Sequence, residues 1–406
     1  MITQEFLSKL TTKTDSKIVF LIFDGLGGSP DASGKTELET AGHPNLDKLA
    51  ETGICGLSDP IAPGITPGSG PAHLALFGYD PLRYEIGRGL LDSLGIDFKF
   101  TKQDLAARGN FATVDAGGVI TDRRAGRLST DKNVSICREI LNDITLDGVN
   151  TFVLPVKEHR FSVIFRGDDL IDALTDSDPQ KEGLKSLKVE IDRSKGPTGN
   201  VEFTPRIVNK FIEEANKRLK NEHPANAVLL RGFAKMIHIP NFDEAYKLRA
   251  AAIALYPMYR GLASLVGMDV LKTGDTMESE FKTLQENYSK YDYFFMHIKA
   301  TDSRGEDGDF ASKVKVIEEV DKLIPMLTSL KPDVIVVTGD HSTPAVIKGH
   351  SWHPVPLLIS AKNCRTDGAK RFSEKECVTG GLGRISAQSI MALALANAGK
   401  LIKYGA

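Results

Sequence analysis

The sequence predicts an α/β protein, with a mainly parallel sheet between helices and a smaller α+β domain inserted into it. Continuous apolar runs at residues 18–23, 293–298 and 334–337 are typical of strands that are buried on both faces of a parallel sheet. An aspartate follows closely after each of these runs. Helix-like segments alternate with strand-like runs toward both ends of the chain, whereas the middle carries short runs with basic residues at their ends.

The length of the chain favours two domains, because 406 residues exceed what one hydrophobic core usually fills. Around residues 105–240 the alternation of strand-like and helix-like segments gives way to short strand-like runs with basic residues at their ends. We therefore expect a discontinuous domain made of residues 1–104 and 241–406, with residues 105–240 as the inserted domain.

In the N-terminal part, two helices are predicted after the first strand. The first, at residues 44–50, opens with Pro44 and stops at Gly53. A loop rich in proline and glycine follows at residues 59–70, and a second helix at residues 72–77 comes directly after it.

The middle of the chain has the pattern of a small α+β domain. Short strands are predicted at residues 110–114, 152–156 and 161–165. We expect the polar stretch at residues 176–199 to be mobile, and a long helix at residues 206–219.

The C-terminal part returns to alternating strands and helices. Beside the apolar runs named above, strands are predicted at residues 251–255 and 355–360. Helices are predicted at residues 259–267 and, from strong periodicity, at residues 310–330.

Composition excludes several classes of function. The chain is 41% apolar and 26% charged with a net charge of −2, so a basic surface for nucleic acid or anionic lipid is not expected. No apolar stretch approaches the roughly 20 residues that span a bilayer, and the polar N-terminus has no signal-peptide pattern. Four cysteines form no CxxC pair, which favours reduced thiols in the cytoplasm over a thiol metal site: Cys55, Cys137, Cys364 and Cys377.

Carboxylates and imidazoles follow the predicted parallel strands. Asp24 ends the first apolar run, and the adjacent pair Asp340 and His341 follows the third. Ligands collect at the carboxyl ends of such strands, and these side chains are typical of a Mn²⁺ or Zn²⁺ site. The alternatives are an ordinary turn aspartate at Asp24 and a polar turn with a solvated histidine after the third strand.

Further candidate ligands follow in two loops. Asp302 and Glu306 lie four residues apart in a glycine-containing loop, where one hard cation could take both; the alternative is a solvated acidic loop. Of His350 and His353, one is expected to be a ligand and the other a bystander.

Ser69 lies between two glycines, directly before a predicted helix. Glycine on both sides leaves the hydroxyl accessible, and the N-terminus of a helix stabilises anions. A serine that carries a phosphoryl group would be well placed here. Serine is also a favoured N-cap, which is the structural alternative.

The inserted domain gathers arginines. Three lie within residues 122–127, and others follow in the same region: Arg123, Arg124 and Arg127, then Arg160, Arg166 and Arg231. Guanidinium groups match phosphate and carboxylate oxygens, so a small anionic substrate is one interpretation and a solvated basic turn the other. Together with a serine nucleophile and two divalent ions, this set fits in-line phosphoryl transfer.

Several motifs resemble those of the alkaline phosphatase superfamily and, within it, the archaeal-type cofactor-independent phosphoglycerate mutases. The superfamily motifs are Asp24-Gly25 and residues 44–53, 338–344 and 350–356; the mutase motifs are residues 67–73, 87–89, 109–115 and 122–127. The resemblance extends over most of the chain. It implies an alkaline-phosphatase-like core as the metal-binding catalytic domain, with the insert as the substrate-binding domain.

The resemblance also implies the activity. Members interconvert 3- and 2-phosphoglycerate through a phosphoserine, with two divalent metal ions and without 2,3-bisphosphoglycerate. Ser69 would be the nucleophile, and Asp24, Ser69, Asp340 and His341 would hold one metal. Asp302, Glu306 and His350 would hold the other, although members usually carry histidine at the position of Glu306. That change favours Mn²⁺ or Mg²⁺, with Co²⁺ and Zn²⁺ as further alternatives.

A small-molecule substrate, phosphoglycerate, is the expected partner, and the oligomeric state is not predicted. The residues expected to bind phosphoglycerate are Arg123, Arg124, Arg127, Arg160, Arg231 and Arg260. Two other functions stay open: a metal-dependent phosphatase or other phosphomutase on the same core, and an inactive protein that binds a phosphorylated metabolite.

Overall fold

The computed structural model describes residues 3–142, 144–196 and 201–405, and the chain divides into two compact units. The first comprises Met1–Glu85 and Ile239–Ala406, and the second comprises Ile86–His238. By this division α5 (Arg88–Gly95) belongs to the second unit, whereas the expected boundary at 104/105 assigns it to the first. The reason is close packing within the second unit, since a Cβ at Gly89 would lie 2.5 Å from Cα of Ala107.

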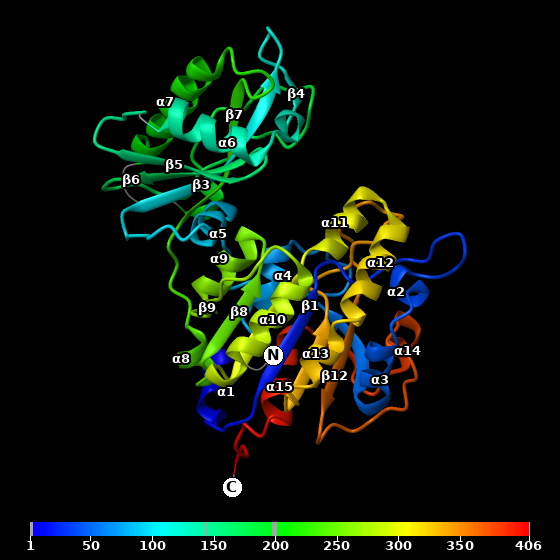
Figure 1. The fold of residues 1–406 in the computed structure, drawn as a ribbon. Helices are drawn as coiled ribbons and strands as arrows, with labels where there is room; N and C mark the ends of the chain where they lie inside the picture. The colour runs from blue at the N-terminus through cyan, green and yellow to red at the C-terminus, as the bar shows by residue number, and fades with distance from the viewer. Residues whose placement is uncertain (1–2, 143, 197–200, 406) are drawn as a thin grey trace. The chain divides into compact units, whose positions relative to one another are not determined.

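Among the described residues, an eight-stranded sheet forms the centre of the first unit (Figure 1). In spatial order its strands are β13 (Gly383–Ser386), β2 (Ile54–Asp59), β12 (Val355–Ala361), β11 (Val334–Thr338), β1 (Ile18–Phe23), β10 (Tyr293–Ile298), β8 (Ala250–Ala254) and β9 (Asp269–Val270). β12 is antiparallel to both of its neighbours, and the other pairings are parallel. The predicted mainly parallel sheet is therefore confirmed.

Helices cover both faces of this sheet (Figure 1). They are α1 (Gln4–Leu10), α2 (Glu37–Thr40), α3 (Pro44–Thr52), α4 (Ser69–Leu76), α8 (Phe242–Tyr246), α9 (Pro257–Leu265), α10 (Met277–Asn287), α11 (Ala300–Asp307), α12 (Phe310–Asp321), α13 (Ile324–Thr328), α14 (Glu374–Thr379) and α15 (Gln388–Asn397). Alternate side chains of β1 pack on opposite faces of the sheet. Val19 and Leu21 lie in a core with residues of α3, α10 and α12. The ring of Phe20 packs on Tyr293, which in turn packs on Phe242 of α8. No helix of the described residues has the length and apolar character to cross a bilayer.

Two predictions about helices are wrong. Residues 310–330 do not form one helix, because α12 ends at Asp321 and α13 begins at Ile324, next to Pro325. Proline has no amide hydrogen and its ring clashes with the preceding turn, which breaks the helix. Asp302 and Glu306 lie on helix α11 rather than in a loop, one turn apart.

The second unit has an antiparallel sheet. The short runs with basic residues at their ends predict strands in this part of the chain. Its strands follow in the order β4 (Ile120–Asp122), β3 (Asp104–Val114), β6 (Arg160–Arg166) and β5 (Asn150–Lys157), with β7 (Ala227–Lys235) on β3. α7 (Phe203–Leu219) and α6 (Thr130–Ser135) lie on one side of this sheet and α5 on the other (Figure 1). Of the polar stretch predicted to be mobile at 176–199, residues 197–199 lie outside the described residues.

A buried carboxylate from α12 caps the start of α3. His43, the N-cap of α3, makes no capping bond with its side chain. Asp321 instead accepts hydrogen bonds from the backbone amides of Leu46 at 2.8 Å and Asn45 at 3.2 Å. These amides belong to the first turn, whose N–H groups have no partner within a helix.

We expect Asp321→Ala to lower the free energy of unfolding of the first unit by about 1–3 kcal/mol, because buried donors lose their acceptor. Urea denaturation followed by circular dichroism measures this change. Glu319→Ala, at an exposed position of the same helix, is the matched control and is expected to change stability by less than about 0.5 kcal/mol. Equal stability of the two variants would contradict the capping role.

Candidate active site

Strand register brings the candidate residues to one edge of the sheet. In the pairing of β1 with β10, Phe23 lies opposite Ile298, and in its pairing with β11, Ile22 lies opposite Thr338. The three parallel strands therefore end together, where ligands collect in open α/β sheets. The residues that follow these ends are Asp24 after β1, Asp302 in α11 after β10, and Asp340, His341 and His350 after β11.

The first group of possible metal ligands is Asp24, Asp340 and His341, whose ligand atoms all lie within 4.8 Å of one another. All three side chains are buried. Nε2 of His341 lies 3.3 Å from Oδ1 of Asp24 and 3.2 Å from Oδ2 of Asp340. The hydroxyl of Ser69 lies 3.2 Å from the same Nε2. Four predicted site residues thus converge around one point.

The second group is Asp302, His341 and His350, again within 4.8 Å. His341 belongs to both groups, and its ring stacks on that of His350 with the centroids 3.6 Å apart. Nδ1 of His350 lies 2.9 Å from the carbonyl oxygen of Pro67, so Nδ1 carries the hydrogen and donates it. In a neutral ring this leaves the lone pair on Nε2, which lies 3.6 Å from Oδ1 of Asp302.

Thr343 fixes the tautomer of His341. Its hydroxyl donates to Oδ1 of Asp302 at 2.8 Å and lies 2.9 Å from Nδ1 of His341. A hydroxyl has one hydrogen, and a carboxylate can only accept, so Nδ1 of His341 must donate to the Thr343 oxygen. The lone pair of His341 is therefore on Nε2 and faces Asp24, Asp340 and Ser69, as metal coordination requires.

The charges of this cluster suit a cation. Among the described residues, Oδ1 of Asp24 and Oδ2 of Asp340 are buried without a hydrogen-bond partner. Burial acts to raise the pKa of Asp24, but Lys299 and His297 outweigh it and hold that pKa well below its usual value. Burial lowers the pKa of His341, which favours the neutral ring. Ionised carboxylates and an imidazole lone pair that point at one place are a ligand set that fits a divalent cation.

Ser69 is not the N-cap of α4, so that alternative is wrong. Gly68 is the N-cap and makes no capping bond with a side chain, and Ser69 is the first helical residue. Its hydroxyl is aimed at His341 instead. Nδ1 of His73, one turn later, lies 2.8 Å from the Ser69 carbonyl oxygen and 3.2 Å from Oδ2 of Asp340, which links the start of α4 to the first group.

Sequence reasoning missed three polar side chains that contact Asp24, and one of them is His297, whose Nε2 lies 3.3 Å from Oδ2 of Asp24. Nζ of Lys299 lies 3.0 Å from Oδ2 of Asp24 and also pairs with Asp302. The hydroxyl of Tyr259 donates to Asp24, and its ring stacks on His297. The position of Lys299 directly after β10 was a usable signal, because a strand end predicted to be acidic attracts a counter-charge. Tyr259 lies on α9 and has no local signal.

Two expected residues lie outside both groups. Glu306 is exposed on α11, one turn beyond Asp302, and belongs to neither group among the described residues. His353, the expected bystander of the two C-terminal histidines, has its Nδ1 2.9 Å from the Ser351 hydroxyl and stacks on Trp352.

The predicted arginines of the second unit form two neighbourhoods. Burial, together with the guanidinium groups of Arg160 and Arg124, lowers the pKa of His159 to about 3, and Arg127 acts in the same direction. This histidine is thus a neutral, buried group among three arginines.

The other neighbourhood surrounds a buried carboxylate. Arg123 donates two hydrogen bonds to Asp178, at 2.9 and 2.6 Å. Burial lowers the pKa of Arg231 to about 10, and Arg108 and Arg88 act in the same direction. The sixth predicted arginine, Arg260, lies on α9 of the first unit.

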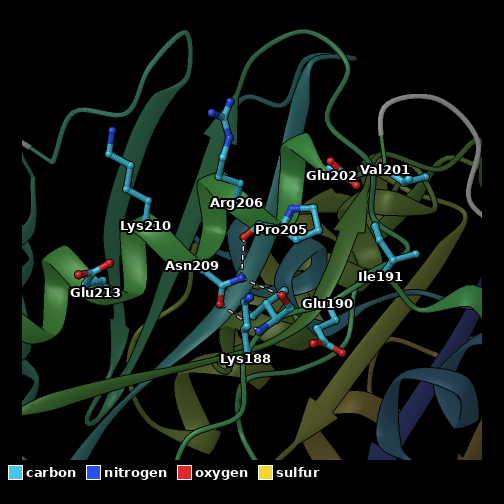
Figure 2. Close-up of a pocket in the computed structure, with 11 residues that line it drawn as sticks. Lys188, Glu190, Ile191, Val201, Glu202, Pro205, Arg206, Asn209, Lys210 and Glu213 are labelled. Atoms are coloured by element: carbon cyan, nitrogen blue, oxygen red, sulfur yellow. Dashed lines mark hydrogen bonds between the residues drawn. The ribbon is translucent and has the colours of Figure 1, made fainter.

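A pocket of about 820 Å³ in the second unit contains none of the predicted site residues (Figure 2). Asn209 is in its wall, and its side chain bonds to the backbone of Val189 and Pro205. Figure 2 shows Arg206 and Lys210 extending away from Asn209. The polar groups of this pocket therefore do not converge on a common point, unlike those at the strand ends of the first unit.

Comparison with known proteins agrees with this geometry. Residues 16–397 match the metalloenzyme superfamily. A protein of Thermosipho melanesiensis is 52% identical over 407 residues, which cover 99% of each chain, and one of Thermus thermophilus is 50% identical over 406 residues, 98% of each. Both are named as probable 2,3-bisphosphoglycerate-independent phosphoglycerate mutases.

Solved structures give the same result. A Pyrococcus horikoshii protein is 31% identical with a TM-score of 0.82, covering 97% of this chain and 100% of its own. The cofactor-independent phosphoglycerate mutase of Thermoplasma acidophilum is also 31% identical, with a TM-score of 0.69 and coverage of 94% and 100%. The chain therefore belongs to the metalloenzyme superfamily and, within it, to the family of 2,3-bisphosphoglycerate-independent phosphoglycerate mutases.

Proposed function

We propose that this protein interconverts 3- and 2-phosphoglycerate through a phosphoserine at Ser69, with two divalent metal ions and without 2,3-bisphosphoglycerate. The observation that carries the proposal is the convergence of three kinds of group at one edge of the sheet. They are the Ser69 hydroxyl, the Nε2 lone pair of His341, and two buried carboxylate oxygens that accept no hydrogen bond among the described residues. The names of the family members supply the substrate.

Two sets of residues would hold the metals. Asp24, Ser69, Asp340 and His341 form the proposed first set, and Asp302, His350 and Glu306 the second. His341 is a member of both groups of possible ligands, which supports two neighbouring ions. Oxygen-rich sets with few imidazoles favour Mn²⁺ or Mg²⁺, while Co²⁺ and Zn²⁺ remain compatible. Such ions, when bound, make a hydroxyl more acidic and offset the charge of the phosphoryl group.

The protein's own groups would direct the transfer. Oγ of Ser69 bonds to the phosphorus of 3-phosphoglycerate while the bond from phosphorus to O3 breaks, and the Ser69 proton passes overall to O3. Glycerate is then held while its O2 turns toward the phosphoserine, and in the return step the proton of O2 passes overall back to Ser69. The phosphoryl group then passes to O2 and frees Ser69. A phosphoserine at the first residue of α4 would lie at a helix N-terminus, whose dipole favours negative charge.

The arginines would hold the carboxylate and phosphate of the substrate. Arg124, Arg127 and Arg160, which surround a neutral histidine, support an anion site in the second unit. Arg123 and Arg231 would complete it, with Asp178 orienting Arg123 through two hydrogen bonds. Arg260, on α9, is the sixth arginine proposed to bind substrate.

An assay with 3-phosphoglycerate and Mn²⁺, without 2,3-bisphosphoglycerate, tests the proposal, with free phosphate followed in parallel. We expect 2-phosphoglycerate to form, and a chelator to abolish its formation. Ser69→Ala is expected to lower kcat by about a thousandfold or more, because the nucleophile is lost, while the fold is unchanged. Release of phosphate without 2-phosphoglycerate would indicate a phosphatase, and substantial mutase activity of Ser69→Ala would refute the phosphoserine.

Glu306→Ala is expected to lower the occupancy of one of the two metal sites, because a proposed carboxylate ligand is lost. Metal analysis after dialysis against Mn²⁺ gives the stoichiometry. Asp307→Ala, at the neighbouring exposed position of α11, is the control and is expected to retain two ions. Two bound ions in Glu306→Ala would remove Glu306 from the ligand set.

Thr343→Val is expected to weaken Mn²⁺ binding by roughly 10–100-fold, because the hydroxyl that orients His341 and Asp302 is lost while the shape is kept. Calorimetric titration with Mn²⁺ measures the affinity. Thr343→Ser restores a hydroxyl and is expected to bind Mn²⁺ nearly as the unaltered protein does. If Thr343→Val binds Mn²⁺ equally well, the assigned hydrogen-bond chain does not support the metals.

A further inference from the structure

A single buried ammonium joins two of the loops that follow the strands. Lys313 lies on α12, and its side chain is fully buried. Nζ donates to the carbonyl oxygens of Gly25 at 2.9 Å, Thr343 at 2.9 Å and Gly27 at 3.3 Å. An ammonium has three hydrogens, so these three carbonyls match its capacity.

Each of these carbonyls belongs to a loop that carries candidate ligands. Gly25 directly follows Asp24, and its amide donates to Asp340 at 3.0 Å. Thr343 follows His341 by two residues and connects it to Asp302. The Thr343 amide also donates to the Gly27 carbonyl at 3.0 Å, so the loop after β1 and the loop after β11 are already adjacent.

The charge of Lys313 has buried partners. Oε1 of Glu37 lies 3.8 Å from Nζ and accepts the amide of Ala345, a further residue of the loop after β11. Burial lowers the pKa of Lys313, and the carboxylates of Glu37 and Glu374 act against that shift. A buried ammonium is costlier than an apolar side chain of similar volume. Packing alone therefore does not account for a lysine at this place.

We propose that Lys313 is a positioning residue, which holds the loop of Asp24 and the loop of His341 in the arrangement that binds the metals. This inference rests on the proposed two-metal function. Lys313 donates only to backbone groups of these loops and to no candidate ligand side chain among the hydrogen bonds described. Its loss would leave every ligand present but less well ordered, so metal affinity is the property that should fall.

The test compares Lys313→Met with Lys315→Met by calorimetric titration of the substrate-free protein with Mn²⁺. Lys315 is exposed on the same helix and is the matched control. For Lys313→Met we expect affinity to fall by roughly 10–100-fold, at a temperature where circular dichroism shows the variant folded, and more Mn²⁺ to be needed for half-maximal activity. Lys315→Met is expected to bind as the unaltered protein does. Equal affinity of a folded Lys313→Met would overturn the inference.

A second variant separates positioning from charge balance and guards against misfolding. Lys313→Met combined with Glu37→Gln removes the ammonium together with the charge of Glu37, its ion-pair partner, while the amide oxygen of Gln can still accept from Ala345. We expect metal affinity to stay low in this double variant. Recovery of the unaltered affinity would overturn the positioning role, because charge balance would then explain the whole effect.

Failure of the proposed function gives a different result from failure of this inference. If the unaltered protein binds Mn²⁺ but forms no 2-phosphoglycerate, the proposed activity is wrong and the titration of Lys313→Met is still decisive. If the unaltered protein forms 2-phosphoglycerate and folded Lys313→Met binds Mn²⁺ equally well, the activity stands and the role of Lys313 is wrong.

Discussion

The in-register pairing of β1 with β10 and β11 is the constraint on which the candidate site depends. Because Phe23 lies opposite Ile298 and Ile22 lies opposite Thr338, three loops leave the sheet at one edge. A parallel register is fixed by hydrogen bonds along the whole strand and by burial on both faces. A shift of any one strand would carry its carboxylate away from the others, so the core of the first unit and its chemistry are specified together.

Close backbone contacts preserve this alignment above the strand ends. A Cβ at Gly27 would lie 1.9 Å from the Ser342 hydroxyl oxygen, and one at Gly305 would lie 2.2 Å from the Thr343 carbonyl oxygen. These contacts let the loop after β1 and helix α11 approach the loop after β11 without an intervening side chain. Lys313 and Thr343 then form buried hydrogen bonds between these segments.

Electrostatics and packing are separate requirements here. The buried carboxylates Asp24 and Asp340 lie near the cations and imidazoles that keep their pKa values low, although burial opposes ionisation. A core designed only for stability would avoid such a cluster, since buried charge is costly unless it is paired. The alignment of these groups at the ends of buried parallel strands is typical of a functional site rather than of a structural ion-pair network.

The sequence by itself determined the class of the sheet, because the apolar runs of β1, β10 and β11 are long and continuous, and it located the aspartates that follow them. It also indicated Ser69 from its glycine neighbours. Only the tertiary structure decided the helical state of Asp302 and the contacts that Thr343 and Lys313 make. The physical reason is that a periodic pattern reports which face of an element is buried, whereas the partner of a polar side chain depends on the strand register and on segments hundreds of residues away.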